Sequence, residues 1–440
     1  MRTIATYQPK NVISFKKQLL HWAQQFNDVV WLDSNNYHHN YSNYDAILAV
    51  DGFTSIQSNY EDAFNKLKEY QSATKDWIFG YLTYDLKNDV EKLSSNNFDG
   101  LGFPDLYFFQ PKKLFLIKND SVEVQYLNFI ADEFEEDLRD IEKEDECHPK
   151  YIISSTVERR RIPEEIKIKL RIHKDEYFEK VNTMLNHIHR GDIYEANFCQ
   201  EFYAENTQIN PLETYFKLNE ISKPPFASYI KFHDKYVLSA SPERYLQKQG
   251  KTIVSQPIKG TAKRSDNAAE DQTLKINLEN DLKERSENIM IVDLVRNDLS
   301  RMALKGSVKV EELCKVYTFE QVHQMISTVV SVVDPVTHAV DIIKSTFPMG
   351  SMTGAPKISA MQIIEKLEET KRGLYSGAIG YFTPTSDFDF NVVIRSILYN
   401  ASKKFVSYSV GSAITSKSNP LKEYEECLVK AKAMREVLEN

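Results

Sequence analysis

The sequence has few cysteines and no long apolar run, and both absences exclude kinds of protein. No stretch of 18 consecutive apolar residues occurs among the 440 residues, so no membrane-spanning helix is expected. The start of the chain, Met1–Tyr7, lacks the apolar core of a secretory signal, which predicts a cytoplasmic location. The four cysteines lie far apart and form no Cys-x-x-Cys pair of a zinc or redox site: Cys147, Cys199, Cys314 and Cys427.

An excess of basic residues is also missing. The chain has 55 Lys and Arg against 63 Asp and Glu, a formal net charge of −8, whereas a general nucleic-acid binder usually presents a basic face. We therefore expect no nucleic-acid partner. With 42% hydrophobic and 12% aromatic residues, the chain has the composition of a globular protein, and its length suffices for one large domain or for two or three smaller ones.

The distribution of charge divides the chain into three parts. Residues 1–130 mix apolar runs typical of strands with a helical stretch at 61–70, and they predict an N-terminal subdomain. Residues 131–165 carry dense acidic runs and three consecutive arginines, which is too much charge to pack a core, and they predict a mobile connector or surface excursion. Residues 166–440 predict the catalytic domain.

Strand-like runs cluster between long helices in the C-terminal part. Apolar residues at helical spacing from Tyr177 to Ile188 predict a helix that Gly191 ends, and a strand at 193–202 follows. This arrangement predicts an α+β protein with extended antiparallel sheets rather than a regular βαβ alternation. Further strands are predicted at 226–232, 236–239, 252–255, 376–382, 390–398 and 405–410, and further helices at 274–299, 361–370 and 422–438.

Several blocks of sequence occur in an order that resembles one enzyme family. They are Ser241–Arg244, Glu287–Arg301, Phe347–Lys357, Arg372–Gly380 and Phe390–Arg395, and Gly80–Leu86 is similar to a further N-terminal block. The family is that of the chorismate-utilising enzymes, to which anthranilate synthase component I belongs. The resemblance covers residues 175–438 and, with the N-terminal block, nearly the whole chain. It implies a fold of large antiparallel β-sheets packed as a sandwich with helices on the outside.

Lys259 stands in the segment Gln256–Thr261, whose Pro-Ile-x-Gly-Thr frame is similar to a family segment with one variable position. Anthranilate and isochorismate synthases carry alanine there, and aminodeoxychorismate synthases carry lysine as a nucleophile. A lone lysine in a loop is usually a solvated surface charge, and only the surrounding blocks outweigh that interpretation. The resemblance implies that chorismate and ammonia are converted to 4-amino-4-deoxychorismate, a step toward 4-aminobenzoate and folate.

The family's proposed route assigns roles to Lys259 and Glu243. Lys259 attacks C2 of chorismate while the C4 hydroxyl leaves, protonated by Glu243 as general acid, and ammonia then attacks C4 and expels the lysine. Because the attacking amine must be neutral, we expect burial or nearby cations to lower the pKa of Lys259. The pKa of Glu243 should be raised. From the sequence alone, an ion pair of Glu243 with Arg244 or with another neighbour is an equal alternative.

Two Glu-x-x-Glu pairs predict a metal site. Glu284 and Glu287, and likewise Glu423 and Glu426, are three residues apart and so share a helical face. Four carboxylates from two facing helices suit Mg²⁺, although with 27% charged residues such spacing also arises by chance on solvated helices. The resemblance implies that these glutamates surround Mg²⁺, with Glu287 and Glu426 as direct ligands and the metal on the ring carboxylate.

Other residues match positions that contact the substrate in this family. Arg395 and Tyr375 match residues that hold the enolpyruvyl carboxylate, where a guanidinium offers two parallel donors. Lys430 matches a lysine near a substrate carboxylate, and Gly260 and Thr261 match a contacting pair. Outside this family, an arginine such as Arg395 more often pairs with a surface acid.

Gln200 and His323 are two further candidates near the substrate. Gln200 is aligned with the position where water-adding isochorismate and salicylate synthases carry a lysine base. Because glutamine cannot deprotonate water, this alignment disfavours water addition. His323 matches a family histidine near the pocket, although a lone histidine is more often a core residue, and we assign it no step.

The segment Gly411–Pro420 departs from the family. A Gly-Ala-Gly turn whose backbone amides meet a substrate carboxylate is replaced by Gly411, Ser412 and Ala413, and Ala413 adds a methyl group where glycine permits close approach. Lys417 and Asn419 replace two aspartates. The departure puts the strength of substrate binding, rather than the identity of the substrate, in doubt.

The source of ammonia is not found in the chain. None of its cysteines lies in the Gly-x-Cys-x-Gly elbow of a glutaminase, so the resemblance implies a separate glutamine amidotransferase partner, with free ammonium as a substitute. Some relatives bind tryptophan in the N-terminal region, and Leu32–Ser34 is similar to a short piece of that site. The Gly350–Lys357 segment does not fit the phosphate-loop pattern and is instead expected near the active site.

Two other functions remain open at this point. Anthranilate synthase component I would have to work despite Lys259 and would also eliminate pyruvate. A non-catalytic binding subunit that kept the fold is disfavoured by the intact Glu243, Lys259, Glu287 and Arg395, but the altered turn at Ala413 leaves it open.

Overall fold

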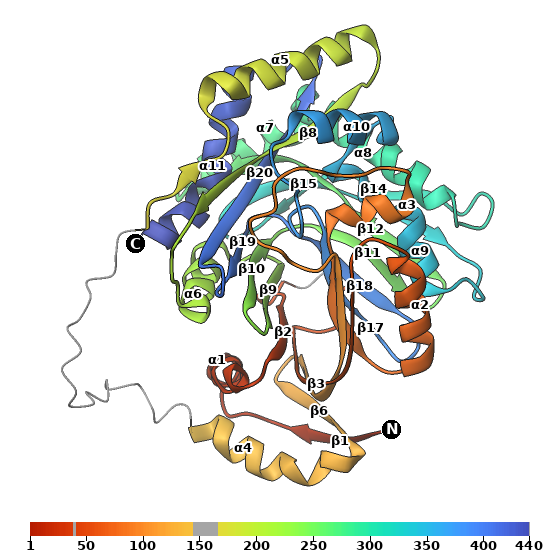
Figure 1. The fold of residues 1–440 in the computed structure, drawn as a ribbon, viewed down its shortest axis with the longest axis vertical. Coiled ribbons are helices and arrows are strands. Elements are labelled where there is room, and N and C mark those ends of the chain that lie inside the picture. Colours follow the sequence, from red (N-terminus) through yellow and green to blue (C-terminus); the bar gives the residue numbers. More distant parts are fainter. Residues whose placement is uncertain (38–40, 144–165, 440) are drawn as a thin grey trace, which may run out of the picture.

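The computed structural model describes residues 1–37, 41–143 and 166–439. Within these residues, eleven α-helices surround a large β-sheet (Figure 1). The helices are α1 Val12–Trp22, α2 Ala63–Thr74, α3 Lys87–Val90, α4 Phe134–Lys143, α5 Lys174–Arg190, α6 Pro211–Ser222, α7 Ala268–Asn280, α8 Leu282–Ser300, α9 Ala339–Thr346, α10 Lys357–Leu367 and α11 Pro420–Glu439. No helix in this part of the chain is both long and apolar enough to cross a membrane.

Twenty strands in the described residues connect through antiparallel ladders into one continuous sheet. The strands are β1 Arg2–Tyr7, β2 Asp28–Asp33, β3 Ala46–Ser58, β4 Ile78–Leu82, β5 Leu106–Lys118, β6 Ser121–Leu127, β7 Lys169–Leu170, β8 Glu195–Ala204, β9 Phe226–Phe232, β10 Lys235–Ser241, β11 Arg244–Gln249, β12 Thr252–Gln256, β13 Ile258–Lys263, β14 Lys309–Thr318, β15 Val322–Val332, β16 Gly354–Ala355, β17 Ala378–Phe382, β18 Phe388–Val392, β19 Ser396–Asn400 and β20 Phe405–Thr415. The α+β fold with large antiparallel sheets, expected from the sequence, is confirmed.

The sheet has two halves that meet at the long strand β5. One half runs β3-β2-β9-β10-β19-β20-β8, and the other runs β4-β17-β18-β11-β12-β15, with β13 and β14 on β15. Strand β5 pairs with β3 along one edge and with β4 along the other. Strands from the N-terminal 130 residues therefore belong to both halves, where β2 pairs with β9 and β4 with β17.

Four hydrophobic clusters occur in the described residues, and the three largest pack these layers together. Side chains of both halves, such as Val30, Tyr81 and Ile379, pack against each other in the core between them. Helices α1, α5, α6, α10 and α11 cover the outer face of the first half, and α2, α8 and α9 cover that of the second. Most of the helices on the outside in Figure 1 thus bury apolar residues against the sheet, whereas the short α3 buries only Lys87.

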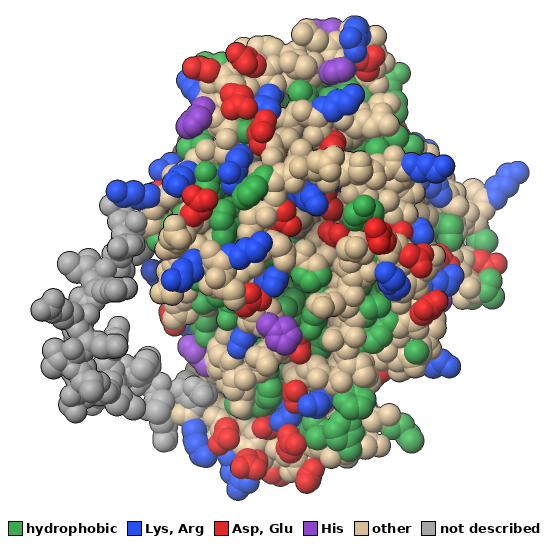
Figure 2. Space-filling view, in the orientation of Figure 1, with side chains coloured by type: hydrophobic (Ala, Val, Ile, Leu, Met, Phe, Trp, Pro, Cys, Tyr) green, Lys and Arg blue, Asp and Glu red, His purple; other side chains and the backbone are tan. Residues whose placement is uncertain are grey.

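The predicted charged connector is in part ordered. Residues 134–143 form α4, an acidic helix whose one buried residue, Ile141, joins the core beside α1. For these residues the alternative of a surface excursion fits better than that of a mobile connector, because Ile141 and the partly buried Phe134 and Leu138 pack against this core. Residues 144–165, with Cys147, lie outside the described residues, and the boundaries of the three domains stay a prediction. Acidic and basic side chains are interspersed over the face seen in Figure 2.

The predicted single helix at 274–299 is two helices. The chain is extended at Asp281 (φ −67°, ψ 113°), where α7 ends and α8 begins. The Asp281 carboxylate accepts hydrogen bonds from the backbone N–H groups of Lys283 (2.8 Å) and Glu284 (3.0 Å), the standard way to satisfy the first amides of a helix. This cap fixes where the first turn of α8 starts, and with it the direction of Glu284 and Glu287.

The predicted strand at 390–398 is likewise broken. Arg395 adopts a left-handed conformation (φ 51°) between β18 and β19, which a continuous strand does not allow. The break turns the chain away from the ladder and lets the Arg395 carbonyl accept a hydrogen bond from Ala240 N–H (3.1 Å). Arg395, which the sequence predicts to bind a carboxylate, therefore also lies at the break between strands β18 and β19.

Removing the cap at Asp281 should loosen the helix that carries two of the acidic residues. For Asp281→Ala we expect a loss of about 1 kcal/mol in the free energy of unfolding, because two helix N–H groups lose their acceptor. Urea denaturation followed by circular dichroism measures the change. Asp281→Asn is the matched control, since asparagine caps equally well. A stability equal to the original for Asp281→Ala would contradict the role of the cap.

Candidate functional site

Lys259 lies on β13, in the half of the sheet covered by α8. Gly260 follows it with φ 93°, and a Cβ atom there would approach the side chains of Met325 and Glu284 to 3.2 and 3.3 Å. Glycine therefore allows β13 to pass close under α8. The Asn288 side-chain amide donates to the Lys259 carbonyl (3.3 Å), which ties the strand to the helix. Thr261 continues β13 and is exposed.

The amine of Lys259 is surrounded by carboxylates. Its side chain is 16% exposed, and Nζ lies 3.6 Å from Oε1 of Glu195 on β8, in the other half of the sheet. Burial by itself would lower the pKa of Lys259, but Glu195, and after it Glu287, Glu243 and Glu426, raise it above the ordinary value. The expectation of a lowered pKa is therefore wrong for the protein alone, because anions rather than cations surround this amine.

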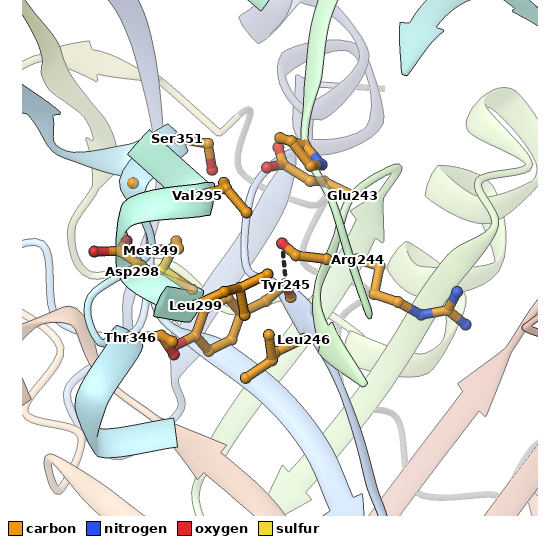
Figure 3. Close-up of a pocket in the computed structure, with 13 residues that line it drawn as sticks. Glu243, Arg244, Tyr245, Leu246, Val295, Asp298, Leu299, Thr346, Met349 and Ser351 are labelled. Atoms are coloured by element: carbon orange, nitrogen blue, oxygen red, sulfur yellow. Dashed lines mark hydrogen bonds between the residues drawn. The ribbon is translucent and has the colours of Figure 1, made fainter. Parts of the chain in front are cut away.

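Glu243 stands between β10 and β11 and is 4% exposed. Burial raises its pKa to about 7, although the Ser351 hydroxyl and the charges of Lys259 and Arg395 oppose the shift. This is the direction expected for a general acid. The alternative of an ion pair with Arg244 does not describe the geometry, since the Arg244 guanidinium is bound by Asp389 (Nε–Oδ1 3.0 Å) and points away from the cavity (Figure 3).

A cavity with about 330 Å³ of empty space opens beside Glu243. Figure 3 shows Glu243 and Ser351 at one end of it and Tyr245, Leu299 and Thr346 at the other. Ser351 belongs to the Gly350–Lys357 segment, so that segment does reach the site. Lys357 of this segment is buried. Its amine pairs with Asp298 (Nζ–Oδ2 2.6 Å) and donates hydrogen bonds to two backbone carbonyls, so its role is structural rather than ligand-binding.

Arg395 and Tyr375 lie near this centre. Within the described residues the Arg395 guanidinium makes no side-chain hydrogen bond or ion pair that would neutralise it. Burial lowers its pKa, and the Glu243 charge opposes the shift. The Tyr375 hydroxyl is 3.9 Å from Sγ of Cys199, on the face of β8 that also carries Glu195. A buried guanidinium without a counter-ion is suited to an incoming carboxylate.

The altered turn lies on β20, opposite β8. Lys430 on α11 donates to the Gly411 carbonyl (2.9 Å) and pairs with Glu426 (2.6 Å). The Ser412 hydroxyl hydrogen-bonds to Glu423, and Ala413 pairs in register with Asn197 of β8. The segment therefore connects the strand beside the site to the acidic face of α11.

The four predicted metal ligands face one another across α8 and α11 but do not form a closed cluster. No three acidic, histidine or cysteine side chains of the described residues stand in metal-binding geometry. Burial raises the pKa of Glu284 and Glu287, and mutual repulsion adds to it: Glu426 acts on Glu284, and Glu284 on Glu287. Oxygen donors that repel one another suit a hard cation. Lys283 lies 3.6 Å from Glu287, and glutamates of both helices raise its pKa.

Gln200 does not belong to the site. Side chains alternate along β8, whose ladder with β20 has no bulge, so Gln200 lies on the opposite face from Glu195. It is buried in the core beside Cys427 of α11. This placement does not support Gln200 as a residue of the site, where Glu195 lies beside Lys259 instead. The alternation itself was the available signal, because the neighbours Phe198 and Phe202 are apolar.

His323 is also held away from the reacting groups. It is 1% exposed on β15, where its two ring nitrogens lie 3.0 Å from Asp271 of α7 and 3.1 Å from Thr318 of β14. These contacts satisfy both nitrogens, as in a structural histidine. The assignment of His323 to substrate binding is not supported by this placement.

A second cavity, with about 550 Å³ of empty space, lies between the two halves of the sheet. Leu32, Asp33 and Ser34, which the sequence related to a tryptophan site, line it together with residues of β17 and β18. Arg244 reaches into it and so connects it to the segment that carries Glu243.

Comparison with known proteins relates this arrangement to one family. The family model described as chorismate binding enzyme matches residues 27–436. The anthranilate synthase component I-like protein of Synechocystis sp. is 34% identical over 370 residues, which are 82% of this chain and 72% of that protein. Aminodeoxychorismate synthase component 1 of Bacillus subtilis is 32% identical over 363 residues, 82% and 76% of the two chains.

The fold is shared with a solved relative. Anthranilate synthase component I from Streptococcus pneumoniae superposes with a TM-score of 0.76 at 26% identity, over 90% of this chain and 93% of that one. Other relatives are longer, and the chain spans only 37% to 58% of three of them, all named aminodeoxychorismate synthases or component 1 of one.

The raised pKa of Glu243 can be measured directly. Infrared difference spectra between pH 5 and 9 should contain the band of a buried carboxylic acid that disappears with a midpoint near 7 and is missing in Glu243→Gln. Because the neutral form is favoured in the fold, stability should also fall as the pH rises from the ordinary pKa of 4.5 to about 7 and then level off, and Glu243→Gln should remove this slope. A carboxyl band that is gone by pH 5 would contradict the assignment.

Proposed function

The chain belongs to the family of chorismate-binding enzymes, and we propose that it makes 4-amino-4-deoxychorismate from chorismate and ammonia. The observation that carries the proposal is Lys259, whose amine reaches the centre of the site between Glu195 and Glu243. In the expectation drawn from the sequence, lysine at this position distinguishes amination through a covalent intermediate from the reactions of alanine-bearing relatives. The proposed pathway is that of 4-aminobenzoate and folate.

Lys259 would act as the nucleophile and Glu243 as the acid. The Lys259 amine attacks C2 of chorismate, the ring double bonds shift, and the C4 hydroxyl leaves as water with the Glu243 proton. Ammonia then attacks C4, the double bonds shift back, and the C2–N bond breaks to release Lys259. A pKa of about 7 keeps much of Glu243 protonated at neutral pH, as this step requires.

The two carboxylates of chorismate need separate partners. The unpaired Arg395 guanidinium, with Tyr375 close by, is suited to the enolpyruvyl carboxylate. Backbone amides at Gly411–Ala413, together with Lys430, are suited to a further carboxylate contact. Gly260 and Thr261 border the same space from β13. Arginine and backbone donors are fixed before the ligand arrives, which reduces the entropy lost on binding.

Mg²⁺ is the proposed cofactor, and the donor set fits it. Glu287 and Glu426 would be direct ligands, with Glu284 and Glu423 around them. Mg²⁺ would supply a Lewis acid that binds the ring carboxylate and draws electron density from the ring. Lys259 would meanwhile lose the attraction of Glu287 and Glu426 for its proton, so that burial would act more strongly to lower its pKa.

The alternatives keep one supporting observation each. Anthranilate synthase component I is supported by relatives of that name and by the shared fold, but it would have to carry Lys259 unused. Water addition is no longer disfavoured by Gln200, which faces the core. A non-catalytic binding subunit would explain the altered segment at Ala413. It would not explain why the pKa of Glu243 is raised.

A glutamine amidotransferase is the proposed partner, in the cytoplasm. Relatives named component 1 of aminodeoxychorismate synthase support a second component. Tryptophan stays a prediction, and the cavity at Leu32–Ser34 is where we would look for it.

The product identifies the reaction. Purified chain incubated with chorismate, Mg²⁺ and an ammonium salt should form 4-amino-4-deoxychorismate, detected by chromatography and mass spectrometry. Lys259→Ala should lose product by at least about 10²-fold, the scale of one catalytic group. Lys263→Ala, at the exposed end of β13, is the matched control.

Other products would change the assignment. Anthranilate with pyruvate would place the chain with the anthranilate synthases, and isochorismate would indicate water addition. Aminodeoxychorismate formation that survives Lys259→Ala would overturn the covalent route.

The metal should be required for activity and for folding of the acidic site. EDTA should abolish product formation, and Mg²⁺ should restore it. Isothermal titration with Mg²⁺ alone should report binding that Glu287→Gln and Glu426→Gln weaken and Glu425→Gln, on the exposed side of α11, does not. Unchanged binding in Glu287→Gln would contradict the ligand assignment.

A further inference from the structure

Glu195 is the carboxylate nearest the reactive amine, and the preceding assignments give it no role. Its Oε1 lies 3.6 Å from Nζ of Lys259, and the residue is 3% exposed. This is the one ion pair that Lys259 makes within the described residues, and it joins β8 to β13 across the two halves of the sheet. Glu195 also stands first among the charges that favour a proton on Lys259.

The backbone of Glu195 is held from two sides. On one side β8 pairs with β20, where Glu195 is in register with Thr415. On the other it pairs with Ala355 of β16, and Tyr194 N–H donates to the Ala355 carbonyl (2.7 Å). A Cβ atom at Gly354 would lie 2.2 Å from the Glu195 carbonyl, so only glycine permits this approach. The carboxylate is therefore presented from a fixed position.

The other carboxylates around Lys259 are engaged elsewhere. Glu243, from the β10–β11 connection, is protonated in part at neutral pH and is reserved for the C4 hydroxyl. Glu287 on α8 lies 3.6 Å from Lys283, and Glu426 on α11 is bound by Lys430 at 2.6 Å. Within the described residues, Glu195 has Lys259 as its single ion-pair partner.

We propose that Glu195 is the proton acceptor that converts the Lys259 ammonium to the attacking amine. The inference rests on the proposed function, because it supplies the deprotonation that the covalent route needs. One proton passes from Lys259 Nζ to a carboxylate oxygen of Glu195. The freed lone pair forms the N–C2 bond while Glu243 gives its proton to the departing C4 hydroxyl, so the leaving group is water.

The protons are restored in the second half of the cycle. Ammonia attacks C4 and the C2–N bond breaks, which returns the bonding pair to Lys259 as a neutral amine. Glu195 then gives its proton back to Lys259, and the new ammonium at C4 gives one to Glu243. The sum is chorismate plus ammonia giving 4-amino-4-deoxychorismate plus water, with each side chain in its starting state.

Glu195→Gln tests the proposal because it keeps the shape of the side chain and removes the base. At pH 7 we expect kcat to fall by about 10² to 10⁴-fold, the usual contribution of a general base, with KM for chorismate little changed. The rate of the variant should then rise about tenfold per pH unit below pH 7, where Glu243 still holds its proton, since the Lys259 proton must leave to solvent. Glu195→Asp should retain part of the activity.

The sign of the electrostatic effect separates this role from a passive one. Removing the Glu195 charge lowers the pKa of Lys259 and so favours the neutral amine. Electrostatics alone would therefore leave the neutral-pH rate unchanged or faster, and a purely structural role would raise KM without altering the pH profile. Glu205→Gln, an exposed charge just beyond β8, is the matched control and should behave like the original protein.

Two further measurements keep the outcomes distinct. With chorismate but no ammonia, intact-mass spectrometry should detect a covalent adduct in the original protein. In Glu195→Gln the adduct should form at least about 10²-fold more slowly, and faster at pH 7 than at pH 6. An original pH profile and kcat in Glu195→Gln overturns the proposal while leaving the Lys259 route intact. If the unaltered protein forms no aminodeoxychorismate, the proposed function itself is overturned.

Discussion

The charge balance at Lys259 is the constraint on which the rest of the site depends. An ammonium group that is mostly removed from water is costly unless anions accompany it, and Glu195, Glu243, Glu287 and Glu426 provide them. The same compensation makes the amine a poor nucleophile, because it stabilises the proton. The protonated form of Lys259 is therefore stable in this site, whereas the proposed reaction requires the neutral amine. The proposed substrate, with its two carboxylates, and the proposed Mg²⁺ would change that balance when they bind.

Environment divides the work among glutamates that are chemically identical. Glu243 is buried in the wall of a cavity, where it is hydrogen-bonded to the Ser351 hydroxyl, and burial raises its pKa to about 7. In Glu426, burial acts in the same direction but is outweighed by Lys430, so its pKa stays below the ordinary value. A carboxyl that keeps its proton suits an acid, and one that stays ionised suits a ligand of a cation. Separation of this kind, rather than residue type, assigns the roles.

Much of the fold and part of the site could be predicted from the sequence. The ordered blocks implied the fold, and the Glu-x-x-Glu spacing predicted acidic faces on two helices, whose Glu287 and Glu426 both raise the pKa of Lys259. The breaks at Asp281 and Arg395 could not be predicted, because each depends on a single φ or ψ inside a stretch that is otherwise regular. Gln200 was misplaced for a different reason, since a match by alignment overruled the period-two alternation of β8.

Two of the residues by which segment 411–420 departs from the family, Ser412 and Asn419, hydrogen-bond to α11. Asn419 accepts from the N–H groups of Leu421 (3.1 Å) and Lys422 (3.2 Å), so it caps α11 as an aspartate would. Ser412 hydrogen-bonds to Glu423 and thereby occupies the most buried of the four glutamates. A glutamate already bound by a hydroxyl is less available to a cation, which agrees with the proposal that Glu287 and Glu426 would be the direct ligands. The segment Gly411–Ala413 of β20 is thus linked, through Ser412 and α11, to the glutamates that act on the pKa of Lys259.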